Sequence, residues 1–353
     1  MPVRAGVDDD RTLTAAIDVW RAGQADLDRR VRQVEERITR LLAVQSPTGY
    51  ELGRLQAQVA RIRGLEQVTI NEANAAAGAV RTWLDGGGMA RVYAAGGGVV
   101  TPSFQWSVPH RAAVEVLADD LYSDVLRATT YMETDAKRII RRLGKRTAAL
   151  GLTGGTTARQ SGDRLTKALS AEFGKLGTVR YKNGSRHGFG EYGQMLMRSK
   201  TAVAYNLGTL AESQRLGIRL FEIFDSPECG LTAHNDPVKA NGLIAPLEVV
   251  MQWPTSHNNC VRALGPRPDA TAATTPDVVA VNPNRDPVMV KALKAAEPPA
   301  ATGRGRPARE GRERRSRPNR VRPGRPTRVQ AVQASTDRDF RRRQAAERAR
   351  AGG

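Results

Sequence analysis

Apolar side chains recur at alternating steps of four and three residues along residues 11–45. The series consists of Leu13, Ile17, Trp20, Leu27, Val31, Val34, Ile38 and Leu41. Its polar interruption is Gln24. This spacing is a heptad seam, which predicts a long helix packed on another helix or on another subunit.

A turn and a second apolar series follow this helix. Residues 46–49, Ser-Pro-Thr-Gly, favour a turn. The second series is Leu52, Leu55, Val59 and Ile62, and it loosens into an alanine-rich stretch over residues 73–80. The simplest arrangement is an antiparallel helical hairpin of coiled-coil type over residues 1–85. A two-helix element without a packing partner is the alternative.

Two glycine triplets, residues 86–88 and 96–98, frame the next segment. They match neither the G-x-x-x-x-G-K-[ST] pattern nor a strand followed by G-x-G-x-x-G, so they do not indicate a phosphate-binding loop. We therefore expect residues 86–108 to form a flexible linker.

Residues 110–150 predict another helix. Its expected core contacts are Val114, Leu117, Leu121, Leu126, Ile139, Ile140 and Leu143. Three basic pairs follow each other between residues 137 and 146. A solvated helix face is the favoured interpretation of these charges, and contact with DNA or with an acidic partner is the alternative.

Strand patterns begin after residue 177. The pair Asn183-Gly184 predicts a two-residue turn in a hairpin over residues 178–188, with His187 at the surface. Residues 190–216 predict a helix that ends at Gly217.

The next strand leads into the segment with the most chemistry. Residues 218–224 alternate and are β-rich, so they predict a strand that delivers Asp225 and Cys229 to a loop. The expected fold is mainly α with a small α+β C-terminal module, placed with its preceding helix in residues 109–268. Residues 269–300 are expected to form an extended connector.

The net charge of +19 is unevenly distributed. Residues 301–353 contain 17 arginines, no lysine and five acidic residues, whereas the preceding 300 residues carry a net charge of only +7. Repeated Gly-Arg and Arg-Pro steps cannot bury enough apolar surface to offset the entropy of ordering, so we expect a disordered tail.

Arginine side chains bind phosphate groups through a planar fork, with an affinity that depends on salt but not on sequence. The expected DNA-binding residues are Arg304, Arg306, Arg309, Arg312, Arg314, Arg315, Arg317, Arg320, Arg322, Arg325, Arg328, Arg341, Arg342 and Arg343. A tail that only solubilises the protein, or only reflects coding composition, is the alternative.

The beginning of the chain and its hydropathy predict a protein made in a cytosol. Residues 1–10 lack the apolar run of a signal peptide. No window approaches the roughly 20 apolar residues of a membrane span. We therefore expect no membrane partner.

Both cysteines of the chain lie close to histidines, in Cys-Gly-Leu-Thr-Ala-His from Cys229 to His234 and in His-Asn-Asn-Cys from His257 to Cys260. Sulfur and imidazole ligands in this number suit a tetrahedral zinc ion. Because the protein would fill all four positions, such an ion would be structural. Three interpretations stay open: a structural zinc site, a metal-free loop held by hydrogen bonds and packing, and a disulfide.

Residues around this segment follow a recognisable order over residues 160–268. They are Arg198 to Gly208 on a helix, Asp225, Cys229, Asp236, Asn241-Gly242, and Ser256 to Arg262. In order and spacing they resemble the C-terminal domain of Mu F-like phage minor head proteins, a head-morphogenesis family, in a variant similar to those of actinobacterial phages. That family shows C-x₂-C and H-P-x-C-R-C patterns, whereas this chain has His234 and Asn258 and no cysteine after Cys260.

The resemblance implies a structural, non-enzymatic component of a tailed-phage head near the portal vertex. The implied partners are the portal protein, the major capsid or scaffold protein, and DNA without sequence preference, but no small-molecule substrate. The implied location is the procapsid or virion interior, after assembly in the bacterial cytoplasm. Alternative functions are a metal-dependent nuclease using His234 and His257, a capsid maturation protease, and a host nucleic-acid-binding protein.

Overall fold

The computed structural model describes residues 11–42, 49–150, 167, 170–181, 184–274 and 287–296. All described residues belong to one compact unit, within Met1–Pro299. This unit is mainly helical, with short strands in its later part. The predicted fold class is therefore confirmed for the helical body and its small α+β portion.

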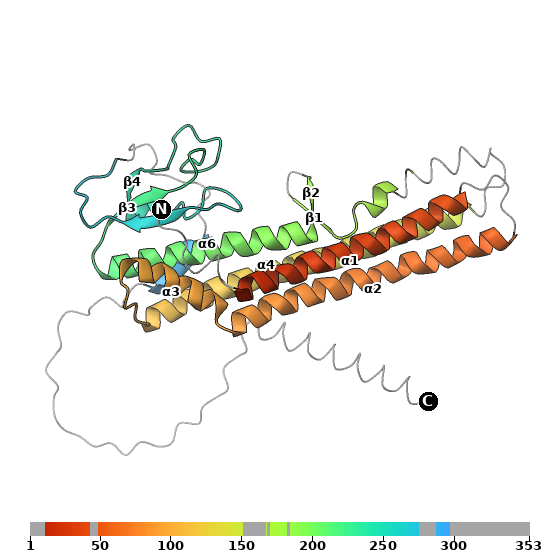
Figure 1. Ribbon diagram of the computed structural model, residues 1–353, viewed down its shortest axis with the longest axis horizontal. Coiled ribbons are helices and arrows are strands. Elements are labelled where there is room, and N and C mark those ends of the chain that lie inside the picture. The colour runs from red at the N-terminus through yellow and green to blue at the C-terminus, as the bar shows by residue number, and fades with distance from the viewer. Residues whose placement is uncertain are drawn as a thin grey trace, which may run out of the picture. The chain divides into compact units, whose positions relative to one another are not determined.

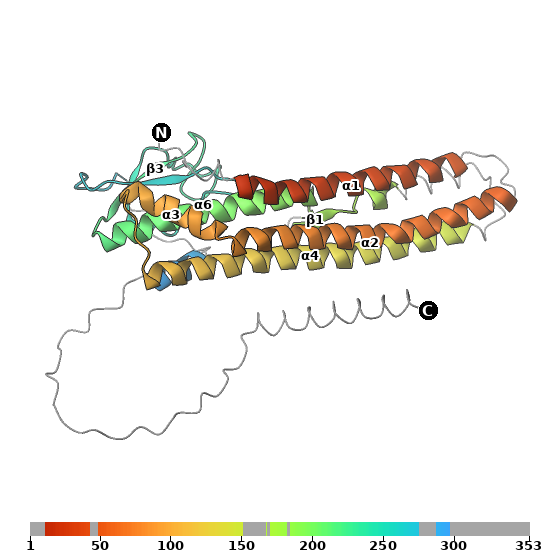
Figure 2. The same ribbon diagram turned by 60° about the horizontal axis from the view of Figure 1, so that its bottom comes forward.

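The heptad seam lies on α1 (Arg11–Leu42), which pairs with α2 (Gly49–Asp85). Figures 1 and 2 show the two helices side by side. The apolar residues of the seam are buried from Leu13 to Ile38, and α1 packs against α6 as well as α2. The seam thus has its packing partners within the same chain. Of the second series, Ile62 is buried, and the side chains of the other three lie outside the described set.

The helical hairpin joins two further long helices, α4 (Val108–Leu150) and α6 (Phe189–Arg215). Helix α2 lies along α4, and α1 lies along α6. Gln24, the polar break in the seam, accepts a hydrogen bond from the backbone N of Phe189 at 2.7 Å. The same amide also donates to the carbonyl oxygen of Gly177 at 2.9 Å, so Gln24 and Gly177 together satisfy an amide at the start of α6 that has no partner within the helix.

The predicted linker over residues 86–108 is wrong for its first part. Residues Gly88–Val100 form helix α3, which packs closely on α6. A Cβ atom on Gly96 would lie 1.9 Å from the carbonyl oxygen of Tyr205, and one on Gly208 would lie 2.0 Å from that of Tyr93. The glycines therefore serve the close approach of two helix backbones, a role that their local sequence does not distinguish from flexibility.

The strands form two small antiparallel sheets. Strand β1 (Thr178–Arg180) pairs with β2 (Arg186–Gly188) as the predicted hairpin. The predicted two-residue turn is wrong, because residues 181–185 separate the paired Arg180 and Arg186; of these, residues 182–183 lie outside the described residues. The second sheet has the order β4-β3-β5, with β3 (Leu220–Phe224) between β4 (Ile244–Pro246) and β5 (Ala263–Pro266). A four-residue helix, α7 (Leu247–Val250), follows β4.

The predicted helix over residues 190–216 is confirmed as α6, and Gly217 follows it with a positive φ of 76°. The predicted extended connector over 269–300 is wrong where Pro287–Ala296 forms helix α8. Helix α8 packs on α4 and α6 and buries Ala292 and Ala296 against them. Its small apolar residues form one face of the helix. A composition rich in alanine and proline does not by itself indicate that face. No helix in the described part of the chain has the length and apolar character of a membrane span.

Candidate metal centre in the Cys/His module

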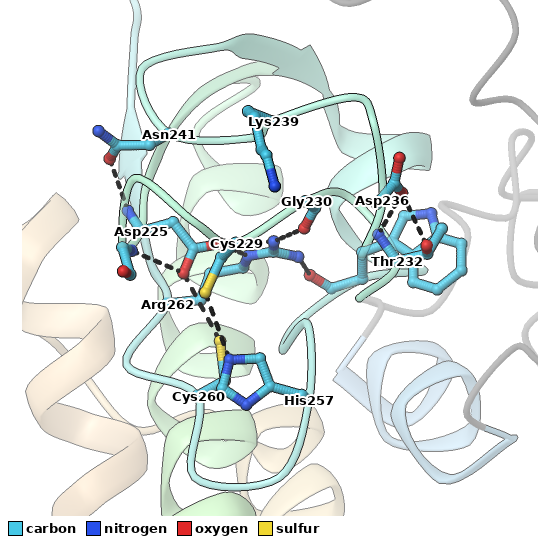
Figure 3. A network of polar contacts seen from close by, with 12 residues as sticks. Asp225, Cys229, Gly230, Thr232, Asp236, Lys239, Asn241, His257, Cys260 and Arg262 are labelled. Atoms are coloured by element: carbon cyan, nitrogen blue, oxygen red, sulfur yellow. Dashed lines mark hydrogen bonds and ion pairs between the residues drawn. The ribbon is translucent and has the colours of Figure 1, made fainter. Parts of the chain in front are cut away.

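The candidate site lies in two loops that leave the sheet β4-β3-β5. The first loop follows β3 and carries Cys229, and the second precedes β5 and carries His257 and Cys260. Because β5 runs antiparallel to β3 with Ala263 opposite Phe224, the start of β5 lies beside the end of β3, and the two loops meet at that end of the sheet. Figure 3 shows their side chains converging.

Asp236 fixes the shape of the first loop. Its two carboxylate oxygens accept hydrogen bonds from the backbone N of Val238 at 2.8 Å and from the backbone N and hydroxyl of Thr232 at 2.9 and 2.6 Å. The side chain of Lys239 donates to the carbonyl oxygens of Glu228 and His234 at 2.9 and 3.1 Å. These contacts set the backbone on either side of His234, and the buried side chains of Leu231 and Ala240 attach the loop to the main apolar core.

An ion pair between Asp225 and Arg262 joins the two loops, and both side chains are 0% exposed. Arg262 Nε and Nη2 lie 2.8 and 2.5 Å from Asp225 Oδ2. The same guanidinium donates to the carbonyl oxygens of Trp253, at 2.8 Å, and Gly230. Burial of a charge is tolerable only when it is paired and hydrogen-bonded, and this guanidinium meets that condition.

Asn206, on α6, ties the second loop to the helical body. It is 0% exposed, and its Nδ2 donates to the carbonyl oxygens of Pro254 and Arg262 at 2.8 and 3.0 Å. A second link to α6 runs from the backbone N of Asn259 to Ser199 Oγ at 3.1 Å. The loop that carries His257 and Cys260 is therefore held at both ends.

Cys229 is the centre of the ligand cluster. Its Sγ lies 3.3 Å from His257 Nε2 and 3.7 Å from His234 Nδ1. Zinc–sulfur and zinc–nitrogen bonds of about 2.3 and 2.0 Å put neighbouring S and N ligands of a tetrahedral ion about 3.5 Å apart. The two observed distances lie on either side of that value, so these three residues fit the edges of a zinc site.

The second shell also suits a metal. His257 Nδ1 lies 2.6 Å from the carbonyl oxygen of Asn258, a contact in which the ring nitrogen donates its proton. The lone pair of Nε2 then faces Cys229, which is the usual orientation of a metal-bound histidine. The imidazole rings of His234 and His257 are stacked with centroids 3.6 Å apart, so they would have to spread apart around an ion.

Cys260 lies on the other side of Cys229, next to Asp225. The ligand atoms of Asp225, Cys229 and Cys260 are all within 4.8 Å of one another, and Cys260 Sγ is 3.6 Å from Asp225 Oδ1. Three of the four residues expected from the sequence, Cys229, His234 and His257, thus form one group of ligand atoms, whereas Cys260 meets only Cys229 and belongs to a second group with Asp225. The sequence placed Asp225 at a strand end and within the family resemblance, but not among the ligands.

The thiol of Cys229 is held neutral by its surroundings. Burial is the main cause that raises its pKa to about 12, and the Asp225 carboxylate and Cys260 add to the effect. A bound cation would reverse this preference, because a coordinating thiol is deprotonated. Both cysteines are free thiols in the structure, so the disulfide that the sequence left open is not formed there.

The other predicted residues lie elsewhere. His187 is exposed on β2, as expected for a surface residue. His110 is buried instead, with its Nδ1 2.9 Å from the hydroxyl of Tyr93 and its Nε2 3.6 Å from Glu212. The arginines expected to bind DNA, from Arg304 to Arg343, lie outside the described residues.

Comparisons with known proteins do not assign this chain to a family, so its function has to be argued from its residues. No family model, no curated protein and no solved structure matches this chain.

Proposed function

We propose that the chain is a structural minor head protein of a tailed bacteriophage, without enzymatic activity. It would act in head morphogenesis at or near the portal vertex and contact packaged DNA through its arginine-rich tail. The observation that supports this proposal most is the linkage of Asn206, Asp225, Asn241 and Arg262, four residues on which the resemblance rests. They are joined by hydrogen bonds through Asp225 N to Asn241 Oδ1, the Asp225–Arg262 pair and Asn206 to the Arg262 carbonyl.

This linkage favours an architectural role for the module. Asn206 donates to backbone carbonyl groups, Arg262 donates to backbone carbonyl groups and pairs with Asp225, and Asp236 accepts from backbone amides and a hydroxyl group. These side chains therefore hold loops together. Zinc held by both cysteines and both histidines would be structural and would leave no position for a substrate. That arrangement requires Cys260 to move toward the histidines, because its Sγ lies in a group with Asp225 and Cys229 instead. We therefore propose that zinc, when bound, closes the module.

The helical body suits the docking part of the proposed function. Helix α1 packs on α2 and α6, and α4 packs on α2 and α6, so the four long helices form a bundle, which is suited to contact with a partner along its length (Figure 1). The proposed partners are the portal protein and the major capsid or scaffold protein. The proposed location is the procapsid or virion interior, after assembly in the host cytoplasm.

Co-purification with the portal protein of the same phage genome tests the proposal. The full chain, co-expressed with that portal protein, should elute with the portal ring in size-exclusion chromatography and remain with it at moderate salt. A portal protein from an unrelated phage serves as the control. Elution of the full chain apart from its own portal ring and from the capsid and scaffold proteins would contradict the proposal.

A nicking assay separates the structural proposal from a metal-dependent nuclease. The purified full chain, incubated with supercoiled plasmid and magnesium, manganese or zinc ions, should leave the plasmid intact. Nicking that disappears in His257→Ala would replace the structural role by a catalytic one, because a nuclease needs an open metal position.

A further inference from the structure

A groove follows one face of α4 and continues beneath the β1–β2 hairpin. Its first hollow, about 400 Å³, and its second, about 440 Å³, share Thr134 and Arg138 in their walls. A third hollow, about 920 Å³, shares Tyr181 with the second and reaches Asn258 in the Cys/His module. Neighbouring hollows share wall residues and so lie next to one another, and we call the three together the groove.

Basic side chains outnumber acidic ones along this groove. The basic residues in its walls are Lys137, Arg138, Arg141, Arg142 and Arg180. The acidic residues in its walls are Asp135 and Glu191. The described residues therefore give the groove a net charge of +3. Asp135 is only 4% exposed beneath Arg138 and Arg186, so its charge is largely neutralised before any ligand arrives.

Two of these arginines are available to a ligand. Arg141 lines the first hollow and Arg180 lines the second, and both are exposed. Among the described residues, no acidic side chain lies within ion-pair distance of either. A guanidinium free of carboxylate partners presents its full fork of N–H donors, which matches the oxygens of a phosphate group.

Aromatic rings lie between these charges. Tyr131 and Tyr181 are half-buried in the walls of the second hollow. Tyr181 also meets His187 edge-on, with ring centroids 4.6 Å apart, and lies 6.0 Å from Tyr192 in the third hollow. Partly exposed aromatic rings within a basic groove are the arrangement by which proteins stack the bases of single-stranded nucleic acid.

We propose that this groove binds a single strand of nucleic acid. Arg141 and Arg180 contact its phosphate groups, and Tyr131 and Tyr181 stack on its bases. From Tyr131 to Arg142 helix α4 rises about 16 Å. A strand with the ~3.4 Å phosphate spacing of a duplex would place about five phosphates along that length, and an extended single strand places fewer. A duplex does not fit this chemistry, because its bases are already stacked and their faces cannot reach a tyrosine ring.

The groove and the arginine-rich tail would bind nucleic acid independently of each other. The experiment must therefore show which residues of the full chain contact the oligonucleotide. We would crosslink the full-length protein by light to a thiothymidine-substituted oligonucleotide of about 15 nucleotides, a length typical of such sites. Mass spectrometry then identifies the crosslinked peptides. The expected result is crosslinking at Tyr131 and Tyr181 with the single strand, and not with a duplex of the same sequence.

Matched variants test the roles of the side chains. Arg141→Ala with Arg180→Ala should lower crosslinking at the two tyrosines about tenfold, since phosphate contacts supply most of the attraction. Arg32→Ala with Arg111→Ala removes the same charge from two exposed positions outside the groove and should have no effect. Tyr181→Phe should keep the wild-type yield at Tyr131, whereas Tyr181→Ala should lower it about tenfold with an unchanged circular dichroism spectrum.

Two outcomes would overturn the groove assignment. Crosslinks confined to residues 301–353 would remove the groove while leaving the proposed head function and its tail contact intact. Equal crosslinking of single strand and duplex at Tyr131 and Tyr181 would show that bases are not being stacked, and the single-strand specificity would be wrong.

Discussion

Arg262 Nε lies 2.8 Å from Asp225 Oδ2 in an ion pair from which water is excluded on both sides. The two residues are 37 positions apart and come from the two loops that carry the cysteines and histidines. Because Arg262 also donates to the carbonyl oxygens of Trp253 and Gly230, it is the group that connects the most segments of the module. The positions of the cysteines and histidines in the candidate metal site therefore depend on an ion pair whose two members are not among the four expected metal ligands.

Removal of this guanidinium should destabilise the protein strongly. Arg262→Leu leaves a buried carboxylate and two carbonyl oxygens without their donor, which costs about 3–5 kcal/mol in comparable buried pairs. Urea denaturation measures the loss. Arg219→Leu is the matched control, because Arg219 pairs with Glu248 at 3.1 Å on the surface, where such pairs contribute about 0–1 kcal/mol. A loss below about 1 kcal/mol for Arg262→Leu would contradict the role assigned to the pair.

The close approach of α3 and α6 predicts opposite effects for two glycines. Gly208→Ala places a Cβ 2.0 Å from the carbonyl oxygen of Tyr93, so the helices must move apart, at a cost of about 1–3 kcal/mol. Gly98 also lies on α3, but a Cβ on this residue would meet no atom within 4 Å. Gly98→Ala should therefore stabilise the protein by about 0.5–1 kcal/mol through helix propensity. Equal changes in melting temperature for the two substitutions would contradict the close packing of α3 on α6.

Metal analysis decides between a zinc site and a metal-free loop. Protein purified from zinc-supplemented cultures should contain about one zinc ion per chain, as expected for a single tetrahedral site. Cys229→Ser, Cys260→Ser and His257→Ala should each lower that content, whereas His187→Ala, at an exposed position outside the cluster, should keep it. Chelation should lower the melting temperature of the wild type, because binding energy contributes to folding. A metal-free wild type with unchanged stability would end the zinc interpretation.

Deletion of residues 301–353 tests the tail contact with duplex DNA. If the tail neutralises about six phosphates, duplex affinity of the full chain should fall roughly a thousandfold between about 50 and 200 mM salt. The truncated chain should bind duplex DNA weakly, with a shallow salt slope. Survival of both affinity and slope after truncation would place duplex binding in the helical body and favour a host nucleic-acid-binding protein.

Local patterns in the sequence were sufficient for most of the helical fold. The heptad spacing from Leu13 to Ile38 predicts a buried seam on α1, and the clustering of Cys229 with His234 predicts a common site. Long-range contacts were not accessible in the same way. Gly96 looks like part of a linker because its neighbour, the carbonyl of Tyr205, is 109 positions away in the chain.

The same limit applies within the candidate site. Asp225 and Arg262 are ordinary charged residues in the sequence, and their pairing depends on the antiparallel register of β3 with β5. Periodicity also failed for α8, because ten residues rich in alanine give too short a pattern to distinguish a helix from an extended segment. The role of such residues depends on which strands pair, so it can be predicted only once the fold is known.

His110 should make stability depend on pH in the mildly acidic range. Burial lowers the pKa of His110 below its usual 6.5, although Glu212 opposes the shift and Arg215 adds to it. As pH falls below about 7, the unfolded chain takes up a proton at this residue that the folded chain does not, so stability decreases until the folded pKa is reached. Glu212, whose pKa is lowered by its hydrogen bond to Arg215, adds to the loss only below about 4.5. Urea denaturation between pH ~7.5 and ~5.5 should show a decrease of at most about 1.4 kcal/mol per pH unit from this residue, the limit for one proton. His110→Gln should reduce the slope of unfolding free energy against pH, and His187→Gln should not. An unchanged slope in His110→Gln would mean that His110 accepts its proton in the folded protein as readily as in the unfolded chain.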